Sequence, residues 1–293
     1  MLTRKYGRAP VGPVQLPRIL GVEATGYVAA APGNEARFPV GSIAMTAVGG
    51  MGIMFDGGYA EYVCVSKDNV QAVRPEAEKL GWDLLEALPE MLQTAHRALF
   101  RSLKLKSGDK LLIRGGTTSV GLATAAAIAK QAGTKVFVTT RKANEKTKQL
   151  LLENGADDVI IDDGTIANTV KKISGGGVDK VLELVGGSTL NDSLTCLSEN
   201  GICCLVGLVG GSASIADFSP LAAIQIGRYL TAYGERTFAA SNLPLDHLVD
   251  QIENGSLKIR IGKVFNMDDI VEAHECMERI EALGKIVVLT GTS

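Results

Sequence analysis

The sequence of 293 residues predicts an α/β protein in which a doubly wound parallel sheet is inserted into a second, β-rich domain. Three observations support this prediction. Residues 110–140 carry an apolar strand, a turn of small residues, an alanine-rich helix and a second strand, in that order. Strand and helix patterns then alternate as far as residue 233. Short β-like runs separated by Gly and Pro occupy the first 90 or so residues.

The first strand–helix–strand unit predicts a dinucleotide site. A strand at 110–114 leads into a turn at 115–121, and a helix is expected from about residue 122 to 131, before a strand at 135–140. Small residues let the backbone approach a pyrophosphate, and a helix N-terminus directs unpaired N–H groups at phosphates. We therefore expect pyrophosphate contacts, mainly through backbone N–H groups, from Thr118, Ser119, Val120 and Gly121.

The turn departs from the pattern G-x-G-x-x-G, because Thr118 fills the second glycine position, whereas Gly121 fills the third. The order and spacing of strand, turn, helix and strand support the prediction more strongly than the motif does. The alternative is a βαβ unit whose turn binds no ligand.

The end of the second strand predicts the cofactor NADP(H). An NAD site usually has Asp or Glu at this point to bind the ribose 2′-hydroxyl. Here the strand ends in Thr139-Thr140-Arg141-Lys142, a cationic sequence that suits a 2′-phosphate. We expect Thr140 and Arg141 to hold that phosphate. The alternative is a solvated helix start, although basic residues are disfavoured at a helix N-terminus by the macrodipole.

The rest of the sheet follows from the same alternation. Further strands are expected at 159–161, 179–185, 202–206 and 229–233, with helices at 144–154, 166–173, 189–197 and near 220–227. Paired glycines follow two of these strands, at 186–187 and 210–211. In open α/β sheets, ligands lie beyond the carboxyl ends of the strands.

The flanking segments predict a second domain. β-like runs at 26–30, 42–46 and 59–65 indicate an antiparallel, barrel-like module. The tail carries a helix at 245–253, a strand around 262–265, a helix at 267–280 and a strand at 285–289. We expect this tail to pack on the N-terminal module. The predicted domains are therefore 1–97 plus 235–293 for catalysis, and 98–234 for the nucleotide.

Composition excludes several classes of function. The formal net charge is −2, and no basic block suggests a nucleic-acid partner or an anionic membrane surface. No apolar run approaches the roughly 20 residues that span a bilayer, and the first residues lack the apolar core of a signal peptide. A cytoplasmic protein is expected. The five cysteines form no C-x-x-C pair and the three histidines are far apart in sequence, so no metal site is expected.

Four motifs resemble those of the medium-chain dehydrogenase/reductases. Residues 17–26 read P-x-x-x-G-x-E-x-x-G, residues 57–62 read GGYAEY, residues 155–157 read GAD and residues 284–287 read GKIV. The zinc alcohol dehydrogenases of this family carry His where this chain has Val22, and they carry a four-cysteine lobe that this sequence lacks. The resemblance is therefore to the zinc-independent branch, and within it to the NADPH:quinone oxidoreductases.

The resemblance implies a Rossmann sheet inserted in a GroES-like β-barrel catalytic domain. Family members usually carry opening barrel strands ahead of the segment with which this chain begins, so we expect a partly truncated barrel. Dimers are common in the family, often through edge strands of the nucleotide sheet, and a homodimer is expected here.

The resemblance also implies hydride transfer from NADPH to a quinone or an α,β-unsaturated carbonyl, without zinc. Tyr59, in a glycine-flanked turn, and Arg4, near the mouth of the active site in the family, are the candidate catalytic residues. A packed structural aromatic is the alternative for Tyr59, and a chain end without a role is the alternative for Arg4.

Further cofactor contacts are implied at three strand ends and on one helix. They are Lys146 for the 2′-phosphate, Val185 and Gly186 for the adenosine ribose, and Thr94, Gly207, Leu208 and Val209 for the nicotinamide. A capping or core hydroxyl is the alternative for Thr94. Two other functions stay open: an enoyl-thioester reductase, for which an acyl carrier would favour a basic rim that the sequence lacks, and a catalytically impaired NADPH-binding protein.

Overall fold

The computed structural model describes residues 3–4, 7–9, 12–122, 126–211, 215–234, 243–279 and 282–291. The chain folds as two compact units. One comprises Thr94–Gly234 and is called the sheet unit. The other combines Met1–Gln93 with Glu235–Ser293 and is called the split unit.

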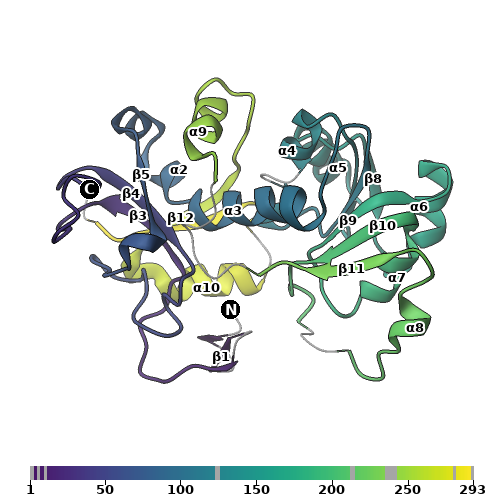
Figure 1. Cartoon of the computed structure of the whole chain (residues 1–293), viewed down its shortest axis with the longest axis horizontal. Coiled ribbons are helices and arrows are strands. Elements are labelled where there is room, and N and C mark those ends of the chain that lie inside the picture. Colours follow the sequence, from purple (N-terminus) through teal and green to yellow (C-terminus); the bar gives the residue numbers. More distant parts are fainter. Residues whose placement is uncertain are drawn as a thin grey trace. The chain divides into compact units, whose positions relative to one another are not determined.

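A six-stranded parallel sheet forms the sheet unit, in the order β11-β10-β9-β6-β7-β8 (Figure 1). The chain starts at β6, moves outward to β8, returns to β9 beside β6 and moves outward the other way. This is the doubly wound arrangement, with its switch point between β6 and β9, and the predicted fold class is confirmed. The strands are β6 (Lys110–Arg114), β7 (Lys135–Thr140), β8 (Asp158–Ile161), β9 (Val178–Glu183), β10 (Leu197–Leu205) and β11 (Tyr229–Ala232).

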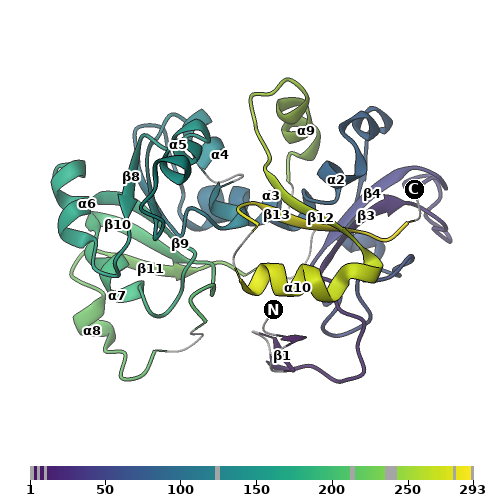
Figure 2. The same cartoon turned by 180° about the vertical axis from the view of Figure 1, so that it is seen from behind.

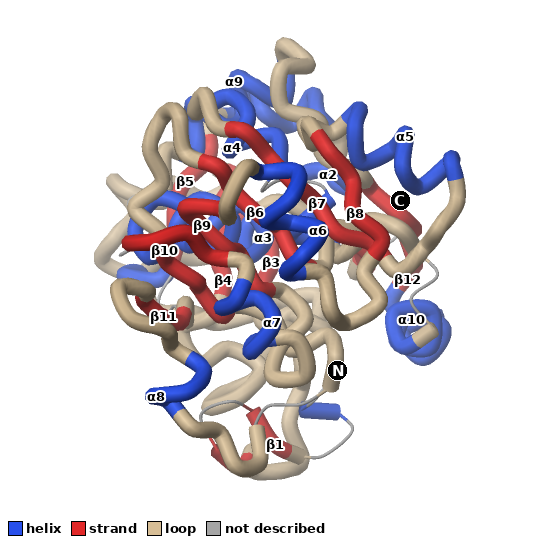
Figure 3. Tube along the Cα trace, turned by 90° about the vertical axis from the view of Figure 1, so that its right-hand side faces the viewer, coloured by secondary structure: helices blue, strands red, loops and turns tan. Residues whose placement is uncertain are grey.

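Helices cover both faces of this sheet. Right-handed crossovers that run in opposite directions along a sheet place their helices on opposite faces. Accordingly, α4 and α5 lie on one side of the strands and α7 and α8 on the other (Figure 1), and the strands run side by side between helices in Figure 3. The helices are η3 (Ala98–Ser102), α4 (Ala126–Gln131), α5 (Glu145–Glu153), α6 (Ala167–Ser174), α7 (Leu190–Thr195) and α8 (Pro220–Ala223).

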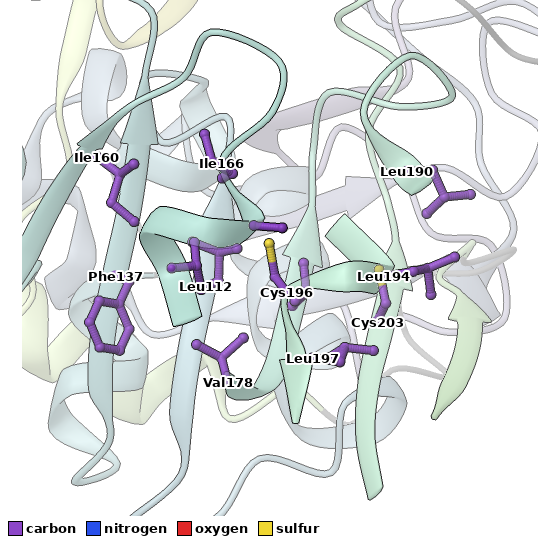
Figure 4. Packing of buried hydrophobic residues seen from close by; sticks show 13 residues of the cluster. Leu112, Phe137, Ile160, Ile166, Val178, Leu190, Leu194, Cys196, Leu197 and Cys203 are labelled. Atoms are coloured by element: carbon purple, nitrogen blue, oxygen red, sulfur yellow. The ribbon is translucent and has the colours of Figure 1, made fainter. Parts of the chain in front are cut away.

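An apolar cluster joins α6 and α7 to one face of the sheet (Figure 4). Leu112 on β6 is in register with Phe137 on β7 and with Val181 on β9, so the three side chains share a face. Val170 of α6 and Leu194 of α7 cover them and are fully buried. Burying a side chain of this size contributes about 1.5–3 kcal/mol to the stability of the folded state. Because side chains alternate between the two faces of a strand, the cluster also decides which face the last residue of each strand occupies.

β10 begins earlier than the sequence predicts. Leu197 already pairs with Val178, and the register shifts before Ile202 pairs with Lys180. Between them Asn200 adopts a left-handed conformation with φ 63°, as at a bulge. The helix expected at 189–197 therefore ends at Thr195, because β10 begins at Leu197.

The described residues of the split unit form three small sheets (Figure 2). β3, β4 and β5 form an antiparallel sheet, and β12 pairs with β13 in parallel. The strands are β1 (Arg8–Ala9), β2 (Gly12–Pro13), β3 (Glu23–Tyr27), β4 (Ile43–Ala47), β5 (Val70–Val73), β12 (Ile261–Asn266) and β13 (Lys285–Leu289). The helices are η1 (Lys67–Asn69), η2 (Pro75–Leu80), α2 (Trp82–Leu85), α9 (Leu245–Glu253), η6 (Met267–Asp269) and α10 (Ile270–Glu278). α3 (Pro89–Arg97) begins in the split unit and ends in the sheet unit.

The helices in the described ranges include none that is long and apolar enough to cross a membrane. The predicted helix at 245–253 and strand at 285–289 are confirmed residue for residue.

The expected strand at 59–65 is wrong. This segment joins no sheet; its first residue instead donates its N–H to Leu20 O at 3.0 Å. A Cβ added at Gly57 would lie 2.2 Å from Gly21 O. The segment thus lies against the loop before β3, in a position that the two preceding glycines permit and that alternation of side chains cannot reveal.

The tail of the chain packs on its first ninety residues. Lys285 on β13 forms an ion pair with Glu23 on β3. Arg74 pairs with Asp250 and Glu253 on α9, the latter at 2.6 Å. These contacts join segments more than 170 positions apart in the sequence.

We predict that Gly207→Ala destabilises the sheet unit. A Cβ at Gly207 would lie 2.1 Å from Leu184 O and 2.8 Å from Leu184 Cα. Because the obstruction is backbone, the ends of β9 and β10 must separate, and overpacking of this kind costs about 1–3 kcal/mol. Urea denaturation should show that loss. The control is Gly26→Ala, whose Cβ meets nothing within 4 Å; equal stability of the two variants would contradict the prediction.

Candidate functional site

The turn after β6 requires glycine at its first two positions. Gly115 has φ 91°, which favours glycine. A Cβ at Gly116 would lie 1.9 Å from Val138 Cγ1, so the turn rests directly on β7. The backbone N–H of Gly116 donates to Thr139 O at 2.9 Å. The turn is therefore fixed to the neighbouring strand at the switch point of the sheet.

A helical segment follows this turn at residues 119–122. The hydroxyl of Thr118 accepts the N–H of Gly121 at 3.1 Å and so caps the helix. Gly121 is buried, and a Cβ there would lie 2.8 Å from Gly115 O. Ser119 and Val120 are half-buried and stand in the first helical turn, where N–H groups lack intrahelical acceptors. Of the four predicted pyrophosphate contacts, the N–H groups of Thr118 and Gly121 are engaged within the turn, the former with Gly115 O at 3.1 Å. Within the described ranges, the N–H groups of Ser119 and Val120 have no acceptor outside their own helix.

A buried row of polar side chains lies beneath the turn. The guanidinium of Arg114, with no exposed surface, donates to both oxygens of Asp162, each at 2.9 Å. It also donates to Asp192 Oδ2 at 2.7 Å. Burial opposes ionisation of Asp162, but the bonds and charge of Arg114 outweigh it and hold the pKa of that carboxyl below its usual range. This cation and its acceptors therefore form a charged cluster inside the sheet unit.

Glu183, at the end of β9, completes this cluster. Its Oε1 accepts the N–H groups of Val185 at 2.7 Å and of Gly186 at 3.1 Å, and Ser193 donates to its other oxygen. Burial raises the pKa of Glu183, and these donors partly oppose that effect. The carboxyl group thereby fixes the backbone of the loop after β9.

The end of β7 carries the predicted 2′-phosphate contacts. Thr140 is buried, and its hydroxyl accepts the N–H of Lys142 at 3.1 Å. Arg141 is exposed and forms no hydrogen bond or ion pair with any residue that the structure describes. Lys146 is also exposed, in the first turn of α5, which Asn144 caps by accepting the N–H of Thr147 at 2.8 Å. Two cations are therefore available beside this strand end.

The loops after β9 and β10 adjoin the glycine turn. Gly210 N donates to Val185 O at 2.8 Å, which joins the two loops. A Cβ on Gly115 would lie 3.2 Å from Val185 Cγ2. Gly207 and Leu208 are half-buried, and Val209 is exposed. The predicted contacts in the turn after β6 and in the loops after β9 and β10 thus lie together at one edge of the sheet. Thr94 is buried within α3, which crosses the division between the units, and its place beside a cofactor stays a prediction.

The split unit contains a cavity of about 1240 Å³. Its lining includes Tyr59 and the Glu23–Lys285 ion pair. Burial, and then the charge of Glu23, raise the pKa of Tyr59 above its ordinary 10.0. The phenol therefore keeps its proton at neutral pH and can act as a hydrogen-bond donor.

The two predicted catalytic residues both lie near His274, on α10. The ring of His274 is 5.6 Å from that of Tyr59, in an edge-on arrangement. Burial lowers the pKa of His274, and the charge of Arg4 adds to this effect. Arg4 itself is paired with Glu278. The structure thus brings Tyr59 and Arg4 into one neighbourhood, although the guanidinium of Arg4 is already neutralised.

No three His, Cys, Asp or Glu side chains are grouped as metal ligands in the part of the chain that the structure describes. Of the five cysteines, Cys196, Cys203, Cys204 and Cys276 are buried and Cys64 is exposed. Burial raises the pKa of the Cys204 thiol to about 11, so this side chain behaves as a small core residue.

Comparison with known proteins agrees with this geometry. Residues 154–288 match the family described as zinc-binding dehydrogenase. A quinone oxidoreductase of Rattus norvegicus is 31% identical over 80% of this chain and 69% of its own length. That of Pongo abelii is 29% identical over 97% of this chain and 82% of its own length. A mycobacterial protein complexed with NADPH superposes with a TM-score of 0.83, at 25% identity, over 99% of this chain and 88% of that one.

A doubly wound sheet with a glycine turn at its switch point defines a dinucleotide-binding type of fold. With these relatives, the chain belongs to the medium-chain dehydrogenase/reductase family, in the branch of the quinone oxidoreductases. The resemblance inferred from the four motifs is thereby confirmed.

Sequence reasoning missed the charged cluster that Arg114 forms with Asp162, Asp192 and Glu183. Arg114 and Glu183 each end an apolar strand, and charged residues are almost never fully buried unless they are paired. That rule could have marked both as paired residues. Their partners Asp162 and Asp192 could not have been identified, because the pairing depends on strand register and on the position of α7.

We predict that Glu86 makes stability depend on pH. Burial first, and then the charge of Glu23, raise the pKa of Glu86 to about 8. The folded protein holds this proton up to about pH 8, whereas the unfolded chain releases it near 4.5. Between these values the folded state binds more protons, so the free energy of unfolding falls as pH rises, by up to about 1.4 kcal/mol per pH unit.

Urea denaturation across this pH window should show the decline in the wild type and a flatter profile for Glu86→Gln. The control is Glu61→Gln. Glu61 lines the cavity of the split unit, as Glu86 does, but it is exposed, and this variant should keep the wild-type slope. Equal slopes for the wild type and Glu86→Gln would exclude this assignment.

Proposed function

We propose that this chain is an NADPH-dependent oxidoreductase that reduces a quinone or an α,β-unsaturated carbonyl compound. Two neighbouring features at the carboxyl end of the parallel sheet support the proposal together. One is the glycine turn at the switch point, and the other is Arg141, an exposed cation directly after β7 that has no partner among the residues that the structure describes. The quinone oxidoreductases and the NADPH-bound relative support the same conclusion.

The residues present fit a dinucleotide phosphate. A Cβ at Gly116 would meet Val138 on β7, so glycine lets the turn pack closely on the sheet at its switch point, where dinucleotides bind in this type of fold. Ser119 and Val120 offer N–H groups at the start of a helix, where anions are favoured. Arg141, assisted by Lys146, provides charge for a 2′-phosphate. NADPH supplies the hydride when bound.

The loops after β9 and β10 complete the proposed cofactor contacts. We assign Val185 and Gly186 to the adenosine ribose, and Gly207, Leu208, Val209 and Thr94 to the nicotinamide. The bond from Gly210 N to Val185 O supports this assignment, because it holds the two loops together at the edge that carries the glycine turn.

A conjugated acceptor suits the side chains of the split unit. A quinone or enone spreads the incoming negative charge to its oxygen, where a hydrogen-bond donor stabilises it. Tyr59 is the proposed donor, because its phenol lines the cavity and keeps its proton at neutral pH. Arg4 is a weaker candidate, since Glu278 already neutralises its charge.

A cytoplasmic homodimer is part of the proposal. β11 ends the sheet and so offers an unpaired strand edge among the described residues. Three large hydrophobic residues near this edge are exposed, namely Tyr229 on β11, Ile226 just before it and Leu221 on α8. A second copy that covers this edge would remove them from water.

Arg141→Glu is expected to weaken NADPH binding by roughly 10- to 100-fold and to leave NADH binding within about twofold, because a charge-assisted hydrogen bond contributes about 1.5–3 kcal/mol. Fluorescence titration with both nucleotides measures this. The control is Lys172→Glu, which makes the same charge change at an exposed position on α6. An equal loss for NADPH and NADH would remove the 2′-phosphate assignment.

Tyr59→Phe is expected to lower kcat with menadione by roughly 10- to 100-fold, the range for loss of a positioned donor. The dissociation constant of NADPH should stay unchanged. Tyr62→Phe is the matched control, because Tyr62 belongs to the same segment and is 78% exposed. Wild-type kcat in Tyr59→Phe would reduce Tyr59 to a packing role.

A further inference from the structure

Four side chains form a polar row across the end of the parallel sheet. The row consists of Asp162, Thr139, Arg114 and Glu183, in that spatial order. Arg114 is in register with Glu183, and the pair Ile113–Val138 places Thr139 next to Arg114. Residues paired in this way point to the same face of a sheet, here the face of the apolar cluster around Leu112. The polar row is thus the last layer of that cluster, directly beneath the glycine turn.

One arm of the row ends on the glycine turn. Thr139 Oγ1 accepts the N–H of Gly115 at 3.0 Å and donates its own proton to Asp162 Oδ2 at 3.1 Å. Asp162 in turn is held by two bonds from Arg114. The first peptide of the turn therefore has a fixed orientation that depends on a hydroxyl, a carboxylate and a guanidinium in sequence.

The other arm ends on the loop after β9. Arg114 Nη1 donates to Ser193 Oγ at 3.1 Å, and Ser193 donates to Glu183. Glu183 then accepts the N–H groups of Val185 and Gly186. One guanidinium thus connects, through two short chains of hydrogen bonds, to both backbone segments that flank the switch point.

Stability alone is a weak explanation for such a row. Replacing a buried ion pair by apolar residues of similar volume is often neutral or stabilising. Three members of the polar row cannot touch a ligand directly, because Arg114, Thr139 and Glu183 are each at most 1% exposed. Asp162 is partly buried, and both of its oxygens are engaged by Arg114. Its effect on a ligand must therefore pass through the backbone groups that it orients.

We infer that the polar row is a positioning device for the nucleotide: it holds the Gly115 peptide and the 185–186 backbone in the orientation that the common ADP part of NADPH and NADH requires. This inference rests on the proposed function. It assigns affinity for the shared part of the cofactor to the polar row, and discrimination between the two cofactors to Arg141.

The test compares Thr139→Val with Thr139→Ser by calorimetric titration of the full chain with NADPH and NADH. Val removes the hydroxyl and keeps the shape, and Ser keeps the hydroxyl. Loss of a hydrogen bond of about 1 kcal/mol corresponds to roughly fivefold in affinity. We expect Thr139→Val to weaken both nucleotides by the same factor, about five- to tenfold, and Thr139→Ser to bind as the wild type does.

A control variant separates positioning from stability. Thr134 is buried just before β7, and its hydroxyl donates to Ala129 O at 2.8 Å, away from the polar row. Thr134→Val should lower the melting temperature and leave both dissociation constants unchanged. If Thr139→Val does not fold, Asp162→Asn, measured below its melting transition, should show the same equal loss for both nucleotides.

The outcomes distinguish the inference from the proposed function. Wild-type affinity in a folded Thr139→Val, with only a lower melting temperature, would overturn the inference and leave the proposed function intact. A loss confined to NADPH would also overturn it, because it would move the effect to the 2′-phosphate. Failure of the wild type to bind either nucleotide would overturn the proposed function and the inference together.

Discussion

The guanidinium of Arg114 has no contact with solvent, and the carboxyl end of the parallel sheet is arranged around it. An unpaired charge in this position would cost several kcal/mol, so the surrounding elements must supply acceptors. Asp162 after β8 and Asp192 on α7 do so directly, and Ser193 relays the network to Glu183 on β9. Asp192 also accepts the N–H of Ile166 at 3.0 Å and thereby holds the start of α6. Strand ends and covering helices are fixed by the same few charges.

This arrangement separates negative and positive charge across the edge of the sheet. The buried side holds three carboxyl groups around one guanidinium. The outer side, after β7, holds Arg141 and Lys146 without partners among the described residues. A dinucleotide phosphate bound as proposed would meet backbone N–H groups and exposed cations, while the oxygens of Asp162 are engaged by Arg114 and those of Glu183 by backbone N–H groups and Ser193. The two sides therefore act on a ligand in different ways, one through geometry and the other through charge.

Much of the fold could be predicted from the sequence because its signals are local. β6 and β7 were predicted to the residue, since buried parallel strands are apolar runs closed by small residues. The segment at 59–65 was predicted wrongly, because its alternation resembles a strand while Gly57 and Gly58 direct it onto another loop. Interactions such as Glu23–Lys285 and Arg4–Glu278 link positions more than 260 residues apart. No pattern in the sequence specifies such pairs, because they depend on how the tail returns to the first strands.

The turn after β6 and the cation after β7 are proposed to bind NADPH together. Calorimetric titration of the intact wild-type chain with NADPH, NADH and 2′,5′-ADP measures whether they do. Saturable binding of NADPH and 2′,5′-ADP, with NADH at least about tenfold weaker, is the expected result, since one charge-assisted contact contributes about 1.5–3 kcal/mol. Equal affinity for NADPH and NADH, or no heat with any of the three, would contradict this proposal.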